Sequence, residues 1–168
     1  MSKAELLKAM EDYFEKDTRR IEHAKKVTYY AEEISKKEKG DHDVVIAAAI
    51  LHDIGIHAAE KKYGSTAGHH QEKEGPPIAR HILEQIGAVP GGNGIDRDKI
   101  DEICAIIGNH HSPGKINSLN FKIVYDADWL VNLKDEYDCH HGKKKLSRII
   151  GKVFLTKTGK EIAKKIYL

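Results

Sequence analysis

The sequence predicts an all-α fold, and three observations carry that prediction. Apolar residues recur with the three-to-four-residue spacing of a helix over several long segments, and no segment of useful length alternates apolar and polar residues as a strand does. Serine, threonine or aspartate precedes most of these segments, where such residues cap helix N-termini. Glycine follows several of them, where helices end. There is no internal repeat, so we expect one helical domain over residues 1–168.

Length and composition restrict the class of protein. A chain of 168 residues suits one domain with a sizeable core, and a formal net charge of +2 gives no clear sign of nucleic-acid binding. Two cysteines, Cys104 and Cys139, provide no disulfide framework and fit a reducing cytoplasm. The N-terminus lacks the apolar stretch of a signal peptide, and no apolar run reaches the ~20 residues that span a bilayer. We therefore expect a cytoplasmic protein without a membrane segment. The sequence leaves the oligomeric state open.

Helix caps divide the N-terminal part of the chain. Ser2-Lys-Ala-Glu5 has the spacing of a capping box and predicts a first helix. Asp17 or Thr18 caps a second helix, which should run to about Lys39 and end at Gly40.

The third predicted helix is apolar on nearly all sides. Asp41 caps it, residues 44–51 form an apolar run, and it ends at His52-Asp53 with Gly55 as its stop. Polar and glycine residues then predict a flexible loop over about residues 56–71.

Proline and glycine mark the boundaries of the next helices. Pro76-Pro77 fits the first turn of a helix. Residues 90–94 are the clearest loop in the chain. Asp96 or Asp98 then caps a helix that leads to His110-His111.

Two features describe the C-terminal third. A helix is predicted from about Asn120, and Lys143–Lys145 is expected to lie in a polar loop. A final helix follows, with Thr158-Gly-Lys-Glu161 as its capping box, so residues 145–168 form a C-terminal helical extension.

A His-Asp pair, His52-Asp53, stands at the end of the apolar run and is the first candidate site. Burial of an unpaired carboxylate is costly unless a counter-charge or a metal compensates it. Adjacent helical residues point about 100° apart, so both can face one site only near a helix end. Other possible ligands accompany the pair: His23 upstream, and the doublet His110-His111 followed by Asp126 and Asp128 downstream.

At these residues the chain resembles the HD-domain superfamily of metal-dependent phosphohydrolases. That superfamily is defined by the order His, His-Asp, Asp, and this sequence has His23, His52-Asp53 and Asp128 in that order. The resemblance covers about residues 20–133 and implies a single helical HD-domain bundle. The segments most similar to small bacterial single-domain members are Leu51–Gly55, Gly75–Arg80 and Asp126–Leu133.

The resemblance implies a metal site made by His23, His52, Asp53 and Asp128. Two imidazoles and two carboxylates are donors that first-row metals accept, so the implied cofactor is Mn, Fe, Co, Ni or Zn, with Mg as a further possibility. The implied reaction is hydrolysis of a phosphoester or phosphoanhydride, in a nucleotide or another small phosphorylated molecule, by a metal-activated water. His52 and Asp53 are the implied catalytic pair, with Asp53 as ligand and as the group that orients or deprotonates the water.

The last ligand is either Asp128 or Asp126, because residues two apart on a helix do not share a face. Asp128 falls on the buried side of its helix, between apolar neighbours at spacings of four and three. The family's last motif often reads Ala-Asp with an apolar stretch and an Asn four residues on, which Ala127-Asp128 and Asn132 match. We predict Asp128 and keep Asp126 as the alternative.

The doublet His110-His111 resembles the extra histidines that hold a second ion in two-metal subfamilies. Where those subfamilies carry one further histidine, this chain has Gln71, and a neutral amide is a poor substitute ligand. His70, Glu72 or Glu74 could take that role. We expect one tightly held ion and a second site that is weak or empty, with the doublet contacting substrate phosphate or its water.

Substrate contacts and competing functions complete the expectations. Lys61, Arg80 and Lys115 flank the implied site and could meet phosphate, and Asn132 is a further candidate contact. Two other functions stay open: a di-iron oxygenase of the same superfamily, and a non-catalytic HD signalling module. Oxygen consumption separates the first alternative from hydrolysis, and retention of all four ligands argues against the second.

Overall fold

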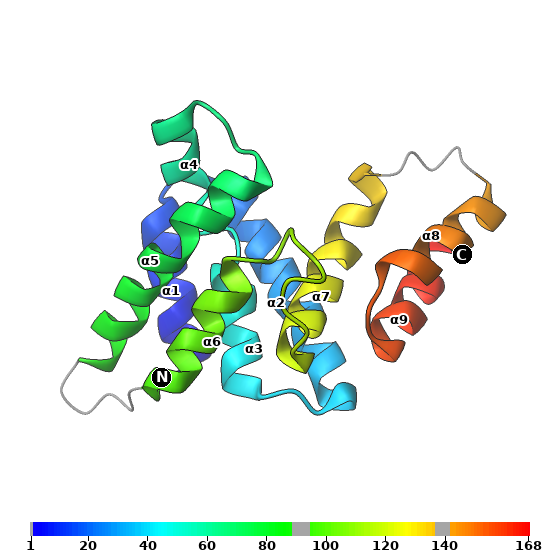
Figure 1. Ribbon diagram of the computed structural model, residues 1–168, viewed down its shortest axis with the longest axis horizontal. Helices are drawn as coiled ribbons and strands as arrows, with labels where there is room; N and C mark the ends of the chain where they lie inside the picture. Colours follow the sequence, from blue (N-terminus) through cyan, green and yellow to red (C-terminus); the bar gives the residue numbers. More distant parts are fainter. Residues whose placement is uncertain (1, 89–94, 137–141) are drawn as a thin grey trace.

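Nine α-helices and no strand form the described part of the chain, residues 2–88, 95–136 and 142–168, in this computed structural model (Figure 1). The helices are α1 (Lys3–Phe14), α2 (Thr18–Glu38), α3 (His42–Leu51), α4 (Ile56–Tyr63), α5 (Gly68–Gly87), α6 (Arg97–Ile107), α7 (Leu119–Glu136), α8 (Lys143–Val153) and α9 (Lys157–Tyr167). The predicted all-α class is confirmed. The loop predicted at residues 90–94 falls outside the described residues.

Helix α3 lies at the centre of the core. Every residue from Val44 to Leu51 is buried, and α1, α2, α6 and α7 pack around it. A helix that is apolar on all sides needs such neighbours on every side. The stretch His42–Tyr63 is long and apolar enough, by composition, to cross a membrane, but 78% of its most apolar window is buried inside the fold. Its apolar character is accounted for by its place in the core.

The predicted N-caps of the first three helices are present. Ser2 and Glu5 exchange both hydrogen bonds of the capping box. The carboxylates of Asp17 and Asp41 accept backbone N–H groups from the first turns of α2 and α3. Each cap satisfies donors that a helix start leaves unpaired. They thereby define where α2 and α3 begin along the sequence.

The loop predicted over residues 56–71 is largely helical, so that prediction was wrong. Ile56–Tyr63 forms α4, which packs against α5 and ends at Gly64 with a positive φ of 63°. Only Ile56 and Ala59 of this short helix are buried. A pattern of two buried residues is too sparse to stand out in the sequence, and packing against α5 supplies the stability that local propensity lacks.

Pro76 and Pro77 lie inside α5, not in its first turn as predicted. Helix α5 begins at Gly68, and the proline nitrogens cannot donate to the carbonyl groups four residues earlier, those of Glu72 and Lys73. Packing keeps the helix continuous: α4 and α6 both lie against α5, and the Cys104 thiol contacts the Pro76 carbonyl at 3.5 Å.

Gly55 is a close-packing residue rather than the helix stop that the sequence predicted. Its φ of −79° is open to any residue, and it precedes the first residue of α4. A Cβ atom here would lie 2.5 Å from both the Gln71 carbonyl oxygen and the Gly75 nitrogen. Because Gly55 and Gly75 have no side chains, the backbone that follows His52-Asp53 can lie directly against the backbone of α5.

Gly55→Ala is therefore expected to destabilise the protein by about 2–4 kcal/mol, because backbone atoms cannot yield to the added methyl group as side chains can. Urea unfolding followed by circular dichroism measures the loss. Gly151→Ala is the matched control: nothing lies within 4 Å of a Cβ there, so alanine in α8 should be neutral or stabilising by up to about 1 kcal/mol. Equal stabilities for the two variants would contradict this account of Gly55.

The C-terminal part forms two helices, α8 and α9, joined by a short turn (Figure 1). Lys143–Lys145 lies in the first turn of α8, so the predicted polar loop there was wrong. The α9 N-cap is Thr156, whose hydroxyl accepts from Gly159 N, and not Thr158. Thr158 instead donates its backbone N–H to Glu38 at the end of α2. The capping role passes to Thr156 because a buried carboxylate holds it in place.

Asp126 is that carboxylate, and it ties α9 to α7. It is fully buried and accepts from Leu155 N, Thr156 N and the Thr156 hydroxyl, each at 2.7 Å. Burial raises the pKa of Asp126 to about 6, against the opposing effect of these hydrogen bonds. The Asp126 carboxylate and the three groups that donate to it therefore attach the C-terminal helices to α7.

Candidate metal centre

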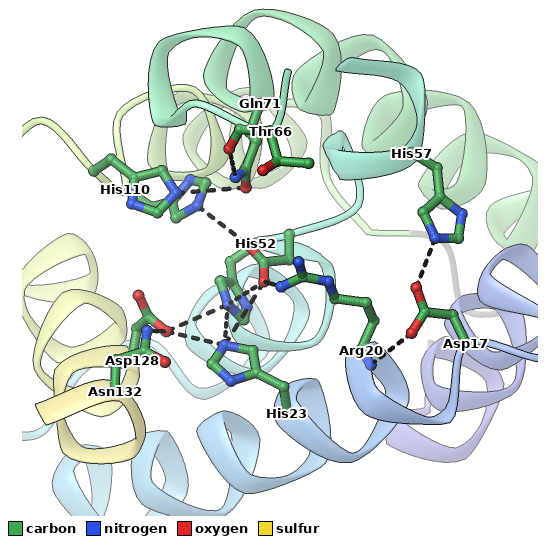
Figure 2. A network of polar contacts seen from close by, with 12 residues as sticks. Asp17, Arg20, His23, His52, His57, Thr66, Gln71, His110, Asp128 and Asn132 are labelled. Carbon is green, nitrogen blue, oxygen red and sulfur yellow. Dashed lines mark hydrogen bonds and ion pairs between the residues drawn. The ribbon is translucent and has the colours of Figure 1, made fainter. Parts of the chain in front are cut away.

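Four side chains from three parts of the chain meet at one point (Figure 2). His23 comes from α2, His52-Asp53 follows α3, and Asp128 comes from α7. The Nε2 atom of His23 lies 3.2 Å from His52 Nε2 and 3.1 Å from Asp128 Oδ1. Asp53 Oδ2 lies 3.7 Å from His23 Nε2 and 3.6 Å from His52 Nε2. Two imidazole nitrogens and two carboxylate oxygens thus form one compact cluster.

His52 and Asp53 can face the same cluster because α3 ends just before them. The helix runs to Leu51, and His52 and Asp53 follow in a turn at its end, where no further helical turn stands between the two side chains and one site. His52 Nδ1 lies 2.8 Å from the Ala49 carbonyl oxygen. A carbonyl only accepts, so Nδ1 carries the hydrogen and Nε2 is turned to the cluster. Such a bond is the usual support of a metal-binding histidine.

The cluster carries an excess of negative charge. Burial alone would lower the pKa of His52, but Asp53 and Asp128 outweigh it and raise that pKa to about 9. Burial likewise opposes ionisation of Asp53 and Asp128, yet the histidines beside them hold both carboxyl pKa values below their usual range. Two buried carboxylates beside neutral imidazoles call for a positive charge. A proton on His52 supplies one positive charge here, and a divalent cation would supply two.

The structure separates the two aspartates between which the sequence left a choice. Asp128 lies in the cluster, and Asn132, one turn later on α7, donates to its Oδ1 at 2.7 Å. Asp126 lies on another side of α7, bonded to the residues before α9. Asn132 thereby orients Asp128, and it also lines the cavity over the cluster.

Both histidines of the doublet turn towards Asp53. Helix α6 ends at Ile107, so His110 and His111 follow in a turn and need not diverge. His110 Nδ1 donates to the Ile107 carbonyl at 2.7 Å, which repeats the support seen at His52. Its Nε2 lies 3.5 Å from Asp53 Oδ1 and has no hydrogen-bond partner although it is buried. One nitrogen from each histidine and one oxygen of Asp53 lie within 4.8 Å of one another.

Glu72 and Gln71, on α5, hold the doublet in place. The Glu72 carboxylate accepts from His111 N and the Ser112 hydroxyl, both at 2.9 Å. Gln71 donates to the Thr66 carbonyl, and its side-chain oxygen lies 3.5 Å from His111 Nε2. Desolvation and the neighbouring His110 lower the pKa of His111 to about 4, so its imidazole is neutral near pH 7.

Several residues predicted for this site lie elsewhere. His70 stacks on the Tyr63 ring at 4.1 Å, and Glu74 bonds to Lys62 and to the Tyr63 hydroxyl. Both face α4 because the region predicted as a loop is a helix that covers that side of α5. Arg80 is paired with Asp101 on the surface, and Lys61 and Lys115 are exposed side chains outside the cavity at the cluster.

A cavity of about 590 Å³ opens over the cluster. The sequence prediction missed seven of its lining residues, and four of them are cations. Arg20 is the nearest, with a guanidinium nitrogen 3.7 Å from Asp53 Oδ2 (Figure 2). The missed residues on α2 could have been identified by their helical spacing from His23, but no local sequence pattern indicates the missed residues on the other helices. The missed residues are Arg19, Arg20, Glu22, Lys26, Val131, Lys134 and Tyr167.

These residues fit a divalent transition metal. Imidazole nitrogen and carboxylate oxygen bind such ions at about 2.0–2.2 Å, which puts neighbouring donors about 3–4 Å apart. His23 Nε2 has such distances to donor atoms of His52, Asp128 and Asp53. Nε2 is the nitrogen left for coordination in His52 and in His110, because Nδ1 of each bonds a carbonyl. The unpartnered Nε2 of His110 also indicates a missing partner at the cluster.

An all-α domain that gathers histidines and aspartates from separate helices under a polar cavity has the architecture of a metal-dependent hydrolase. The model of the HD domain matches residues 20–133, and the chain belongs to that family. A solved structure described as a predicted HD superfamily hydrolase, from an uncultured Thermotogales bacterium, is 28% identical to it. The match covers 98% of this chain and 84% of that one, with a TM-score of 0.69. A search of curated proteins found no match.

Proposed function

We propose that this protein is a metal-dependent phosphohydrolase that cleaves a phosphoester or phosphoanhydride in a small phosphorylated molecule. The convergence of His23, His52, Asp53 and Asp128 beneath a cavity lined by cations carries the proposal. The carboxylates and imidazoles suit a divalent ion, and the cations suit phosphate. A cytoplasmic setting belongs to the same proposal and agrees with Cys104, a buried free thiol.

The proposed roles follow from position. His23, His52, Asp53 and Asp128 hold the ion, which when bound lowers the pKa of a coordinated water from 15.7 towards ~7. Asp53 also reaches His110 through its second oxygen, so it is placed to orient or deprotonate that water. His110 and His111 then contact the water or a phosphate oxygen. Arg20, beside Asp53, stabilises negative charge that develops on the phosphoryl group.

A screen of purified protein tests the proposal. Mono-, di- and triphosphate nucleotides are supplied with Mn, Fe, Co, Ni, Zn and Mg in turn, and phosphate release is measured. We expect release with at least one transition metal and none in excess chelator. No release from any compound with any of these metals would defeat the proposal.

We expect one ion to be held tightly per chain. Each site has a group of three close donors, but the one around His23 also has Asp128 Oδ1 at 3.1 Å from His23 Nε2, whereas the one at the doublet has the neutral Gln71 as its neighbour. Elemental analysis after chelator-free purification should give about one equivalent. Two equivalents per chain, both lost in the His110→Ala/His111→Ala variant, would contradict this and favour a dinuclear centre. Oxygen consumption by an iron-loaded protein would then support the oxygenase alternative.

Metal binding should weaken as the pH falls. The pKa of His52 is about 9 without an ion, so at pH 7 its Nε2 carries a proton that binding must displace. The affinity for Mn²⁺ should therefore fall about tenfold for each unit of pH between about 8.5 and 6.5. Titration calorimetry at constant ionic strength measures it. An affinity independent of pH over this range would show that His52 is not a ligand or is not protonated beforehand.

A further inference from the structure

The cavity over the cluster is lined almost wholly by polar and charged side chains. Apart from Val131 and Tyr167, every lining residue is charged, a histidine or an amide. Four are cations: Arg19, Arg20 and Lys26 on α2, and Lys134 on α7. Such a lining suits a ligand that carries several negative charges, rather than a ligand with a large apolar surface.

Helix geometry places cations on both sides of the metal cluster. Arg20 and Lys26 lie three residues before and three residues after His23, so all three share one face of α2. Each step of three residues is about 4.5 Å along the helix axis. Positive charge therefore extends along α2 past the cluster in both directions, over more length than one phosphate group at the cluster can contact.

Three of these cations have no acidic partner among the residues that the structure describes. Arg20 is beside Asp53, but within the described ranges Arg19, Lys26 and Lys134 form no ion pair. The neighbouring Lys25 points elsewhere and pairs with Glu11 and Glu22. Besides the candidate ligands Asp53 and Asp128, the acidic residue that lines the cavity is Glu22. It forms an ion pair with Lys25. With a divalent ion bound, positive charge in the cavity would exceed negative charge.

We propose that the substrate carries two or more contiguous phosphates, one at the metal centre and the others on Arg19, Lys26 and Lys134. This rests on the proposed hydrolase function and narrows it to phosphoanhydrides such as nucleoside di- and triphosphates. A phosphate at the centre meets the ion, Arg20 and the doublet. The outer cations are exposed, so each contributes little by itself, but several around one polyanion select for its charge and steer its approach.

Lys26→Gln and Lys25→Gln are the decisive pair, because they remove the same charge from adjacent positions on α2. We expect Lys26→Gln to raise KM for a nucleoside triphosphate by about 3- to 5-fold, and the Arg19→Gln/Lys26→Gln/Lys134→Gln variant by about tenfold or more. KM for the corresponding monophosphate should rise by less than about threefold. Lys25→Gln should change both constants by less than about 1.5-fold, because the Glu22 carboxylate that it would release is exposed and screened by solvent. The triphosphate KM should also rise more steeply with ionic strength.

The outcomes separate this inference from the hydrolase proposal. Hydrolysis of monophosphates with equal or better efficiency, or equal shifts for both substrates in the triple variant, would overturn the inference while leaving the hydrolase in place. If no phosphate compound is hydrolysed, calorimetry with inorganic tripolyphosphate at buffered free Mg²⁺ decides the inference alone. Binding that weakens in Lys26→Gln but not in Lys25→Gln supports it, and absence of binding, or equal loss in both, overturns it.

Discussion

Asp53→Asn is expected to reduce bound metal below about 0.1 equivalent per chain and to lower hydrolysis by at least about 10³-fold. One oxygen of Asp53 lies within 3.7 Å of His23 and His52, and the other lies 3.5 Å from His110. Asparagine preserves the shape but removes the charge and one oxygen. The ligand and the water-orienting group are therefore lost together. Elemental analysis and a phosphate-release assay measure the two effects.

Asp101→Asn serves as the control for Asp53→Asn. Asp101 carries the same charge but is exposed and pairs with Arg80 on the surface. It should retain metal and activity, and its stability should change by less than about 1 kcal/mol. Asp53→Asn should keep a helical circular-dichroism spectrum. If a folded Asp53→Asn protein retains its ion and its turnover, the proposed metal centre is wrong.

Asp128→Asn and Asp126→Asn are expected to produce opposite defects although only one residue separates them. Asp128→Asn should lose bound metal and activity, because Asp128 Oδ1 lies 3.1 Å from His23 Nε2. Asp126→Asn should keep the metal and lose about 2–4 kcal/mol of unfolding free energy. Its NH2 group would replace one carboxylate oxygen and so face either the Leu155 donor or the two Thr156 donors, and α9 would lose part of its attachment.

Metal content and chemical unfolding in excess chelator, measured on both variants, test this contrast. The chelator removes any contribution of bound ion to stability, so that unfolding reports the fold alone. Loss of metal from a well-folded Asp126→Asn protein would restore Asp126 as the ligand. Marked unfolding of Asp128→Asn in chelator would instead make Asp128 a structural residue.

The fold class and the early helix boundaries could be predicted because their signals are local. The Ser2–Glu5 capping box and the caps at Asp17 and Asp41 act on backbone groups within one turn. The apolar run at residues 44–51 shows directly that the third helix is enclosed on all sides. Where the deciding contact came from a distant residue, as at Thr156 beside Asp126, the predicted boundary was wrong.

The candidate ligands were predictable for a different reason. Their order, His23, His52-Asp53 and Asp128, matches a family pattern, and each residue lies where its helix can present it. The outer residues of the cavity lack such a pattern. Lys134 and Tyr167 reach it only through the packing of α7 and α9, and the sequence instead suggested Lys61, Arg80 and Lys115, which lie outside it.

The sequence by itself determined an all-helical chain and the histidines and aspartates available to a metal, since helical periodicity, caps and ligand chemistry belong to individual residues and their near neighbours. Tertiary structure alone decided which of these side chains meet. The end of α3 turns His52 and Asp53 to one point, the turn after α6 adds His110 and His111, and α4 draws His70 and Glu74 away. These outcomes depend on distances between segments far apart in the chain, which packing sets and no local pattern contains.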